Sequence, residues 1–391
     1  MANSNNLEQS VQSLPLQSYY DSKNFEDELK AIWQNEWIYA CHEKSLKEPL
    51  SFITLKISNY NVVILRDKNS ELVAYLNTCR HRGSILCEED SGKLKKNLLV
   101  CQYHQWSYNV SDGKLVKTSS FEIPANFNPD DHTLHKVQMQ IWNGLIFINF
   151  NNKAKWDIDS SPFHTTRKMF QDYDDTVNKV GLENFEIGHT WQKTIKCNWK
   201  IFWENYSECL HCPNIHPELS DLVPVYSRRI MDIKDSPDWE ELSKTPDPKF
   251  QGGLKEGAET WSSDGSAQGH KLKALSEVKD FPGHIYLTNW PSMFMAIFID
   301  HIRIVRVTPI DKENMSLSVD WFFESATLAD PKYDKKNVVD FATLVMGQDG
   351  DACELNQKGV YNPAAKTGTL MPEEYELKRF HDWLRQKVNY A

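Results

Sequence analysis

Two short pairs of potential metal ligands constrain this chain more than any other feature of its sequence. They are Cys79-x-His81 and Cys101-x2-His104, separated by 19 residues. Each pair follows a strand-like segment, so two loops could hold one metal centre between them. Two thiolates on one iron and two neutral imidazoles on the other would form a [2Fe-2S] cluster. The alternative is a structural zinc site, but zinc fingers usually keep their cysteines together and their histidines together, whereas each pair here is mixed.

Composition and charge narrow the classes of partner. The formal net charge is -10 at pH 7, which argues against a nucleic-acid partner because such proteins need a basic face. No stretch approaches about 18 uninterrupted apolar residues, so we expect no membrane span. The N-terminus lacks a basic segment followed by an apolar run, so no export signal is visible and a cytoplasmic protein is expected. The eight cysteines are then expected to be thiols or metal ligands rather than disulfides.

The first half of the chain predicts a helical segment followed by a β domain. Apolar residues at helical spacing indicate an amphipathic helix at about 22–36. Short β segments separated by turn-prone pieces fill residues 38–150, as in a small antiparallel domain. We therefore expect three parts: a helical segment at 1–40 that packs on the larger domain, a β domain at 41–155, and the larger domain at 156–391.

The second half mixes strands and helices. Its strands and helices are segregated along the chain rather than alternating, which predicts the α+β class. The expected elements are a strand at 185–196, a helix at 198–212, a polar surface excursion at 235–280, four antiparallel strands within 284–323, and helices at about 335–358 and 373–388.

A second cluster of potential ligands lies in ENYSECLHCPNIHPEL, residues 204–219. The residues before Pro213 include neither Gly nor Pro, so we expect the helix to continue up to that proline. On such a helix Glu208 and His211 share one face. Pro213 would end the helix, and the chain could then bring His216 round to the metal of His211.

The Cys209-x2-Cys212 pair inside this segment suggests two other kinds of site. Cys209 and His211 would point to nearly opposite sides of the helix, which argues against a zinc site built from the pair. A redox-active CxxC has its reactive thiolate at a helix N-terminus, whereas this pair would lie at the C-terminal end. We therefore expect both cysteines to be packing residues. Asn205 would lie one turn before Glu208 on the face that carries His211.

Three ordered motifs, covering roughly residues 20–390, resemble those of the Rieske non-haem iron oxygenases. CRHRG followed by CQYHQWSY resembles the Rieske motif, and ECLHCPNIH resembles the (Asp/Glu)-x2-His-x4-His motif of this family. QDGDACELNQKGV resembles the downstream helix that carries the third, anionic iron ligand. Alignment on its CE-x2-Q pattern places that ligand at Asp349, with Asp351 as the competitor. Gln102 and Gln105 depart from the family pattern, because many members have Pro and Gly there.

The resemblance implies a fold and two metal centres. The fold would combine a small all-β Rieske domain with a catalytic domain of the helix-grip type, which has an antiparallel sheet and helices. The expected ligands are Cys79, His81, Cys101 and His104 for the [2Fe-2S] cluster, and His211, His216 and Asp349 for a single ferrous iron.

The resemblance also implies a route for electrons between the two centres. Glu208 would not be a ligand; it would hydrogen-bond His211 of its own chain and His104 of a neighbouring subunit. Such a bridge implies a ring of subunits, usually a homotrimer. Asn205 would lie near the iron. Neither a GxGxxG motif nor a plant-type ferredoxin cysteine pattern is present, so electrons from NAD(P)H would require a separate flavin- or ferredoxin-type reductase.

The motifs look most like those of oxygenases that act on quaternary amines such as glycine betaine, where a hydroxylated N-methyl group leaves as formaldehyde. The alternative enzyme is the large subunit of an aromatic-ring-hydroxylating dioxygenase acting on an aromatic acid. A Rieske electron carrier without oxygenase activity would have no use for His211, His216 and an acid. A trimethylammonium group needs an aromatic cage, and the available residues are Trp203, Tyr206, Trp261, Trp290, Phe294 and Phe298.

Overall fold

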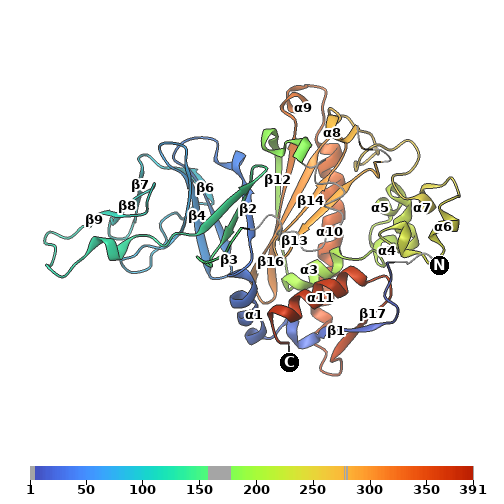
Figure 1. Ribbon diagram of the computed structural model, residues 1–391, viewed down its shortest axis with the longest axis horizontal. Helices are drawn as coiled ribbons and strands as arrows, with labels where there is room; N and C mark the ends of the chain where they lie inside the picture. The colour runs from blue at the N-terminus through green and yellow to red at the C-terminus, as the bar shows by residue number, and fades with distance from the viewer. Residues whose placement is uncertain (1–4, 157–177, 277, 279–280, 391) are drawn as a thin grey trace. The chain divides into compact units, whose positions relative to one another are not determined.

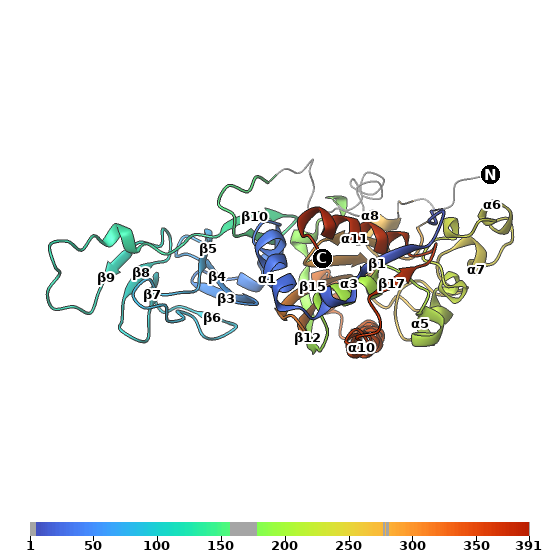
Figure 2. The same cartoon turned by 90° about the horizontal axis from the view of Figure 1, so that it is seen from below.

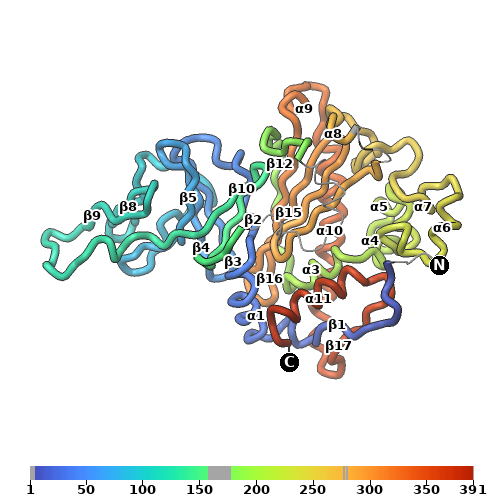
Figure 3. The backbone as a smooth tube through the Cα atoms, viewed as in Figure 1, coloured from blue at the N-terminus to red at the C-terminus, as the bar shows by residue number. Residues whose placement is uncertain are grey.

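The computed structural model describes residues 5–156, 178–276, 278 and 281–390 (Figures 1 and 3). The chain divides into two compact units. One unit comprises Met1–Ile32 and Ser161–Ala391, and the other comprises Trp33–Ser160. Along the sequence, the second unit is therefore inserted into the first. None of the helices in the described residues has the length and apolar character needed to cross a membrane.

The inserted unit is built from small antiparallel sheets, as the short β segments predicted. Their strand orders are β5(Leu72–Leu76)-β4(Tyr60–Arg66)-β3(Ser51–Ile57)-β6(Ser91–Lys93), β10(Gln138–Trp142)-β11(Leu145–Asn149)-β2(Ile38–His42), and β7(Leu98–Val100)-β8(Ser107–Asn109)-β9(Leu115–Lys117). Residues 33–40 belong to this unit rather than to the N-terminal helical segment, because β2 pairs with β11.

The larger unit is built on a five-stranded antiparallel sheet. Its strand order is β12(Glu186–Ile195)-β16(Asn314–Phe323)-β15(Ile302–Asp311)-β14(Met293–Ile297)-β13(Ile285–Asn289). The expected strand at 185–196 and the four later strands all join this sheet. In β16, buried residues alternate with partly exposed ones over most of the strand, which is the pattern of a sheet with one packed face. The α+β class is therefore confirmed.

Long helices pack beside this sheet. Helix α10(Lys336–Gly359) contacts β12 and α3(Trp199–Tyr206), and α11(Tyr375–Lys387) contacts α3. Gly350 faces β12, and a Cβ at that position would make an ordinary van der Waals contact of 3.4 Å with the Ile195 side chain. Near α11, β1(Val11–Pro15) pairs with β17(Thr367–Leu370), and Figure 2 shows the two strands side by side. Helix α1(Ser22–Glu28) continues as a π-turn over Leu29–Trp33, within the predicted helix.

The predicted helix at 198–212 is wrong in its second half. Asn198 caps the N-terminus of α3 with its side chain, which accepts a hydrogen bond from the Lys200 N–H, and the helix ends at Tyr206. Ser207 Oγ donates to the Trp203 carbonyl at 2.6 Å, a side-chain bond of the type that competes with helix propagation. Pro213 does not end a helix; it lies in the first turn of α4(Cys212–Ile215), where a missing N–H costs nothing.

The predicted surface excursion at 235–280 is also only partly right. It contains short helices, including α6(Trp239–Leu242) and α7(Pro248–Gln251). Its centre, however, is buried against the sheet: Thr260, Trp261 and Ser262 are at most 3% exposed. Thr260 Oγ1 donates to Asp300 at 2.7 Å. The polar composition of residues 235–280 gave no sign that residues 260–262 are buried in the core.

Candidate metal centres and their surroundings

The loops that follow β5 and β7 bring the four potential cluster ligands together. The imidazole rings of His81 and His104 have their centroids 4.9 Å apart. The thiols of Cys79 and Cys101 interact with each other and are buried, with 3% and 1% exposure. The sequence-predicted residues therefore converge in pairs of one kind, sulfur with sulfur and nitrogen with nitrogen.

This arrangement suits two irons better than one zinc ion. A tetrahedral zinc site would hold its four donor atoms within about 4 Å of one another. Across the described part of the chain, only His211, His216 and Asp349 bring three such donors within 4.8 Å of one another. The donors of the two cysteines and two histidines therefore lie too far apart for one ion, as expected when a bridged iron pair separates sulfur from nitrogen ligands.

The loop surroundings prepare these side chains as ligands. Burial raises the pKa of Cys79, whereas the pKa of Cys101 is lowered because backbone N–H groups of Tyr103 and His104 outweigh its burial. Tyr108 Oη lies 3.2 Å from Cys79 Sγ. Burial and the neighbouring His104 lower the pKa of His81, which favours the neutral, ligating imidazole.

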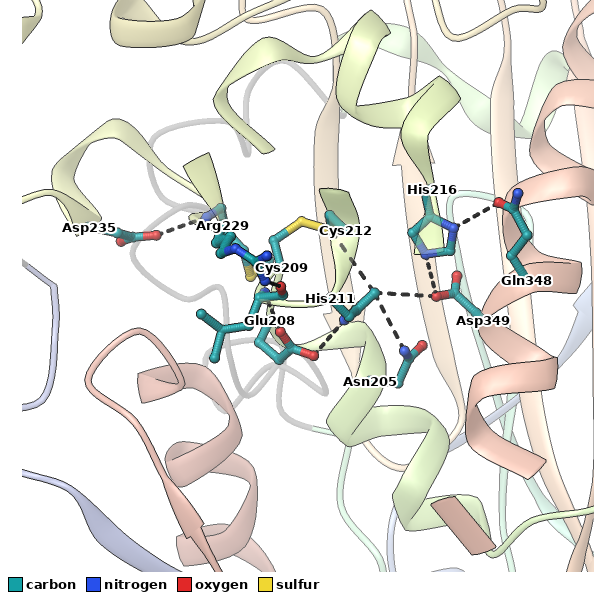
Figure 4. Close-up of a disulfide and its surroundings, with 12 residues drawn as sticks. Asn205, Glu208, Cys209, His211, Cys212, His216, Arg229, Asp235, Gln348 and Asp349 are labelled. Atoms are coloured by element: carbon teal, nitrogen blue, oxygen red, sulfur yellow. Dashed lines mark hydrogen bonds and ion pairs between the residues drawn. A yellow bond between two sulfur atoms is a disulfide. The ribbon is translucent and has the colours of Figure 1, made fainter. Parts of the chain in front are cut away.

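The second centre combines side chains from three places in the larger unit. His211 directly precedes α4, His216 lies between α4 and α5(Pro217–Leu222), and Asp349 is on α10. His216 Nε2 lies 2.8 Å from Asp349 Oδ1, and His211 Nε2 lies 3.5 Å from the same oxygen (Figure 4). Two imidazoles and one carboxylate on one side of an ion are the donor set that non-haem ferrous iron takes. These residues could therefore hold the iron.

Each imidazole is fixed through its other nitrogen. Glu208 Oε1 accepts from His211 Nδ1 at 2.6 Å, and Gln348 Oε1 accepts from His216 Nδ1 at 2.9 Å (Figure 4). Both Nε2 atoms face Asp349 and would ligate an ion bound between the three side chains. Sequence reasoning missed Gln348, although its position next to a potential ligand was the available signal.

The charges around His211, His216 and Asp349 favour the ionised form of the Asp349 carboxylate, which is the form that binds a metal. Burial alone would raise the pKa of Asp349, but hydrogen bonds from His211 and His216 hold it below its usual value. Burial alone would lower the pKa of His211, but Asp349 and Glu208 raise it to about 9. The side chain of Asp351, in contrast, is 81% exposed and lies 3.5 Å from Lys193, outside the group. Asn205 Nδ2 lies 3.5 Å from His211 Nε2.

A disulfide joins Cys209 to Cys212 (Figure 4), so the expectation of thiols or metal ligands rather than disulfides is wrong for this pair. Both residues do pack in the core, as expected. The reason for the disulfide is the early end of α3. Residues after Tyr206 form a turn in which the Cys212 N–H donates to the Cys209 carbonyl at 3.1 Å, and this turn brings the two sulfurs together. The bond encloses His211 within a four-residue ring.

The aromatic residues named as cage candidates separate into two groups. Trp290 packs against Phe380 in the core near α11, and Trp203 lies between the groups, since its ring meets Phe380 at 6.5 Å and Tyr206 at 5.6 Å. The other four lie beside the β13 and β14 face of the sheet and α3, where Tyr206 stacks on Phe294 with centroids 4.1 Å apart. Tyr286, which sequence reasoning did not single out, meets Tyr206 edge-on at 6.0 Å.

Comparison with solved structures gives the fold. A quaternary ammonium Rieske monooxygenase in complex with L-carnitine superposes with a TM-score of 0.72 at 20% identity, covering 97% of this chain and 96% of that chain. Naphthalene 1,2-dioxygenase from Rhodococcus sp. gives 0.71 at 17% identity, covering 96% and 94%.

Comparison with curated sequences extends over nearly the whole chain. The glycine betaine monooxygenase oxygenase subunit of Pseudomonas aeruginosa is 28% identical, covering 96% of this chain and 89% of that protein. The chloroplastic choline monooxygenase of Beta vulgaris is 26% identical, covering 95% and 76%. Residues 36–126 match the Rieske [2Fe-2S] domain, and residues 182–389 match the catalytic domain of the ring hydroxylating alpha subunits. The chain therefore belongs to the Rieske non-haem iron oxygenases, as an alpha (oxygenase) subunit.

Proposed function

We propose that the chain hydroxylates an N-methyl group of a quaternary ammonium compound and thereby demethylates it. Cys79, His81, Cys101 and His104 would hold the [2Fe-2S] cluster, and His211, His216 and Asp349 the single ferrous iron. When bound, these groups supply one-electron transfer and O2 activation. One O2, two electrons and two protons convert N–CH3 to N–CH2OH and water. The C–N bond of the product then breaks, giving formaldehyde, the tertiary amine and a proton.

The packing of Tyr206, Tyr286 and Phe294 is the observation that supports a cationic substrate. Their rings meet at centroid distances of 4.1 to 6.5 Å, and aromatic faces attract quaternary ammonium groups. Tyr206 directly follows Asn205, whose amide lies 3.5 Å from His211 Nε2. A methyl group held by these rings would be near the proposed iron. The relatives named as glycine betaine, carnitine and choline monooxygenases agree with this choice.

Glu208 and the exposed end of the cluster site support electron transfer between subunits. His81 is exposed and His104 partly exposed, whereas both cysteines are buried, so the imidazole end faces a potential partner. Glu208 already holds His211 and would accept a hydrogen bond from His104 of a neighbouring copy, in a homotrimer. A separate reductase would supply electrons from NAD(P)H, in line with the oxygenase-subunit names of the relatives.

The test is turnover of the protein with both metal centres loaded. With an NADH-dependent reductase, we expect glycine betaine or a related quaternary amine to give one formaldehyde for each NADH and O2 consumed. Aromatic acids would serve as competing substrates. A cis-diol product with no formaldehyde from any quaternary amine would overturn the proposal in favour of ring hydroxylation.

Two neighbouring acids on α10 provide a matched pair for the iron site. Asp349→Asn should remove one of three irons per chain and abolish turnover while the visible spectrum of the cluster persists. Asp351→Asn, on the same helix with its side chain 81% exposed, should retain all three irons and activity. Equal iron content in the two variants would exclude Asp349 as a ligand.

A further inference from the structure

A buried guanidinium on the central sheet lacks an anionic partner. Arg303 on β15 is 4% exposed, and no salt bridge joins it to a carboxylate among the residues that the structure describes. Its Nε is buried without a hydrogen-bond partner. Around it are aromatic rings, with Phe298 at 5.5 Å and Trp261 at 5.9 Å from Cζ to the ring centroid. A buried cation without a counter-ion is costly, so an anion is expected to complete this site.

The sheet register directs Arg303 toward the aromatic residues of the proposed substrate site. Tyr286 pairs with Ala296, and Ala296 pairs with Arg303, so the three side chains lie in one row on one face. The small Ala296 leaves room for the two long side chains to meet above it. Burial raises the pKa of the Tyr286 hydroxyl to about 12, and the positive charge of Arg303 opposes this shift. The Arg303 guanidinium therefore lies close to Tyr286.

Two more nitrogen groups without partners converge on the same place. Trp261 Nε1 and His284 Nδ1 are both buried with no hydrogen-bond partner. The rings of Trp261 and His284 have centroids 5.2 Å apart, and His284 meets Tyr286 at 4.9 Å. Burial and the positive charge of Arg303 lower the pKa of His284 to about 4. The site therefore offers a guanidinium and an indole N–H, with an imidazole that can present a third donor.

This group of donors adjoins the proposed iron site. Tyr286 lies between them: it contacts Arg303 on one side and Tyr206 on the other. The charge of Asp349 also raises the pKa of Tyr286. A small molecule could therefore extend from the rings of Tyr206 and Phe294 to the guanidinium.

We propose that Arg303, together with Trp261 and His284, binds the carboxylate of the substrate. An ionised carboxylate only accepts hydrogen bonds, and a guanidinium can donate two to it in parallel. This inference rests on the proposed function and deepens it: the substrate is a zwitterion that carries a carboxylate as well as a quaternary ammonium group. Choline-like alcohols would bind poorly, because they leave the guanidinium without a counter-ion.

Binding to the loaded protein without reductase tests this assignment separately from catalysis. The probes are two matched pairs, glycine betaine against choline and benzoate against benzamide, titrated by calorimetry. We expect the acid of at least one pair to bind about tenfold or more tighter than its neutral-ended analogue. Arg303→Gln should lower the affinity for that acid by about 30-fold or more, because the lost contact is charge-assisted. The affinity for the neutral-ended analogue should change little.

Two further variants keep the test decisive. Trp261→Phe keeps an aromatic ring and removes the indole N–H, so it should lower the affinity for the acid several-fold. This variant tests the site even if Arg303→Gln fails to fold. Arg306→Gln, on the same strand but the opposite face, is the control and should leave the preference for the acid unchanged. Equal affinity within both pairs, or a preference that survives Arg303→Gln, would overturn the assignment. Tight betaine binding without formaldehyde production would refute N-demethylation but leave the carboxylate site intact.

Discussion

Replacing Glu28 by Gln removes the carboxylate that faces the Lys200 ammonium beneath α3. Both side chains are fully buried, and Lys200 Nζ lies 2.6 Å from Glu28 Oε1. The ammonium also donates to the Ser18 carbonyl at 3.0 Å and to Asn198 Oδ1 at 2.8 Å, while the Trp199 indole donates to Glu28 at 2.8 Å. A Gln amide offers one acceptor where the carboxylate received two donors, and it carries no charge.

The expected loss follows from this geometry. Breaking one member of a fully buried pair costs about 3–5 kcal/mol, because the other charge stays buried without compensation. That is about a third of the stability of a typical domain. Burial lowers the pKa of Lys200 and Glu28 opposes the shift, so without the carboxylate the folded unit binds fewer protons than the unfolded chain. The loss should therefore be present at pH 7 and shrink as the pH rises toward the ordinary lysine pKa of about 10.4.

Urea unfolding measures this effect. Tryptophan fluorescence reports both units, since eight of the 13 tryptophans lie in the larger unit and five in the inserted one. The visible absorbance of the cluster follows the inserted unit alone and should not shift, so a fluorescence change without an absorbance change is assigned to the larger unit. Glu241→Gln breaks an exposed pair with Lys244 and should cause no measurable change. Adding Lys200→Met to Glu28→Gln should restore most of the stability. A loss below about 1 kcal/mol for Glu28→Gln alone would refute the reasoning.

Three further predictions concern the metal centres and the proposed carboxylate site. Gln348→Leu removes the acceptor at His216 Nδ1 and should lower iron affinity about 10–100-fold, measured as iron retained against a chelator at constant cluster absorbance. Gln105 adopts the left-handed conformation at φ 57°, so Gln105→Gly should stabilise the cluster unit by about 1 kcal/mol in thermal melts, whereas Gln102→Gly should give no gain. Because the pKa of His284 is about 4 in the folded protein and about 6.5 unfolded, stability should fall by up to about 3 kcal/mol as the pH drops between those values; His284→Gln should flatten that part of the pH profile.

Much of the fold was predictable because local pattern and final environment agree. The alternation in residues 315–323 survives as β16, and the helix expected at 335–358 is α10 within one residue at each end. Both elements are long and strongly patterned, so tertiary contacts do not override them. The ligand residues were found because metal chemistry restricts both residue type and spacing.

The predictions of local structure were wrong where contacts with other parts of the chain outweighed the local sequence pattern. The chain after Tyr206 leaves the helix although no Gly or Pro interrupts it, because Ser207 bonds back to the Trp203 carbonyl. The Cys209–Cys212 bond depends on that turn and could not be derived from a helical wheel. Gln348 and Arg303 were missed for a different reason: their roles depend on pairings across the fold, which no short window of sequence contains.

The insertion of one unit into the other sets an order for biogenesis. When residue 160 has been synthesised, the whole β unit exists, whereas β12, α10 and α11 of the larger unit are still to come. At about 5–20 residues per second, the remaining 231 residues (391 minus 160) take roughly 10–50 s to translate. The sulfur-bridged iron pair can thus be assembled on a nascent chain that cannot yet bind the mononuclear ion, since Asp349 is among the last residues made.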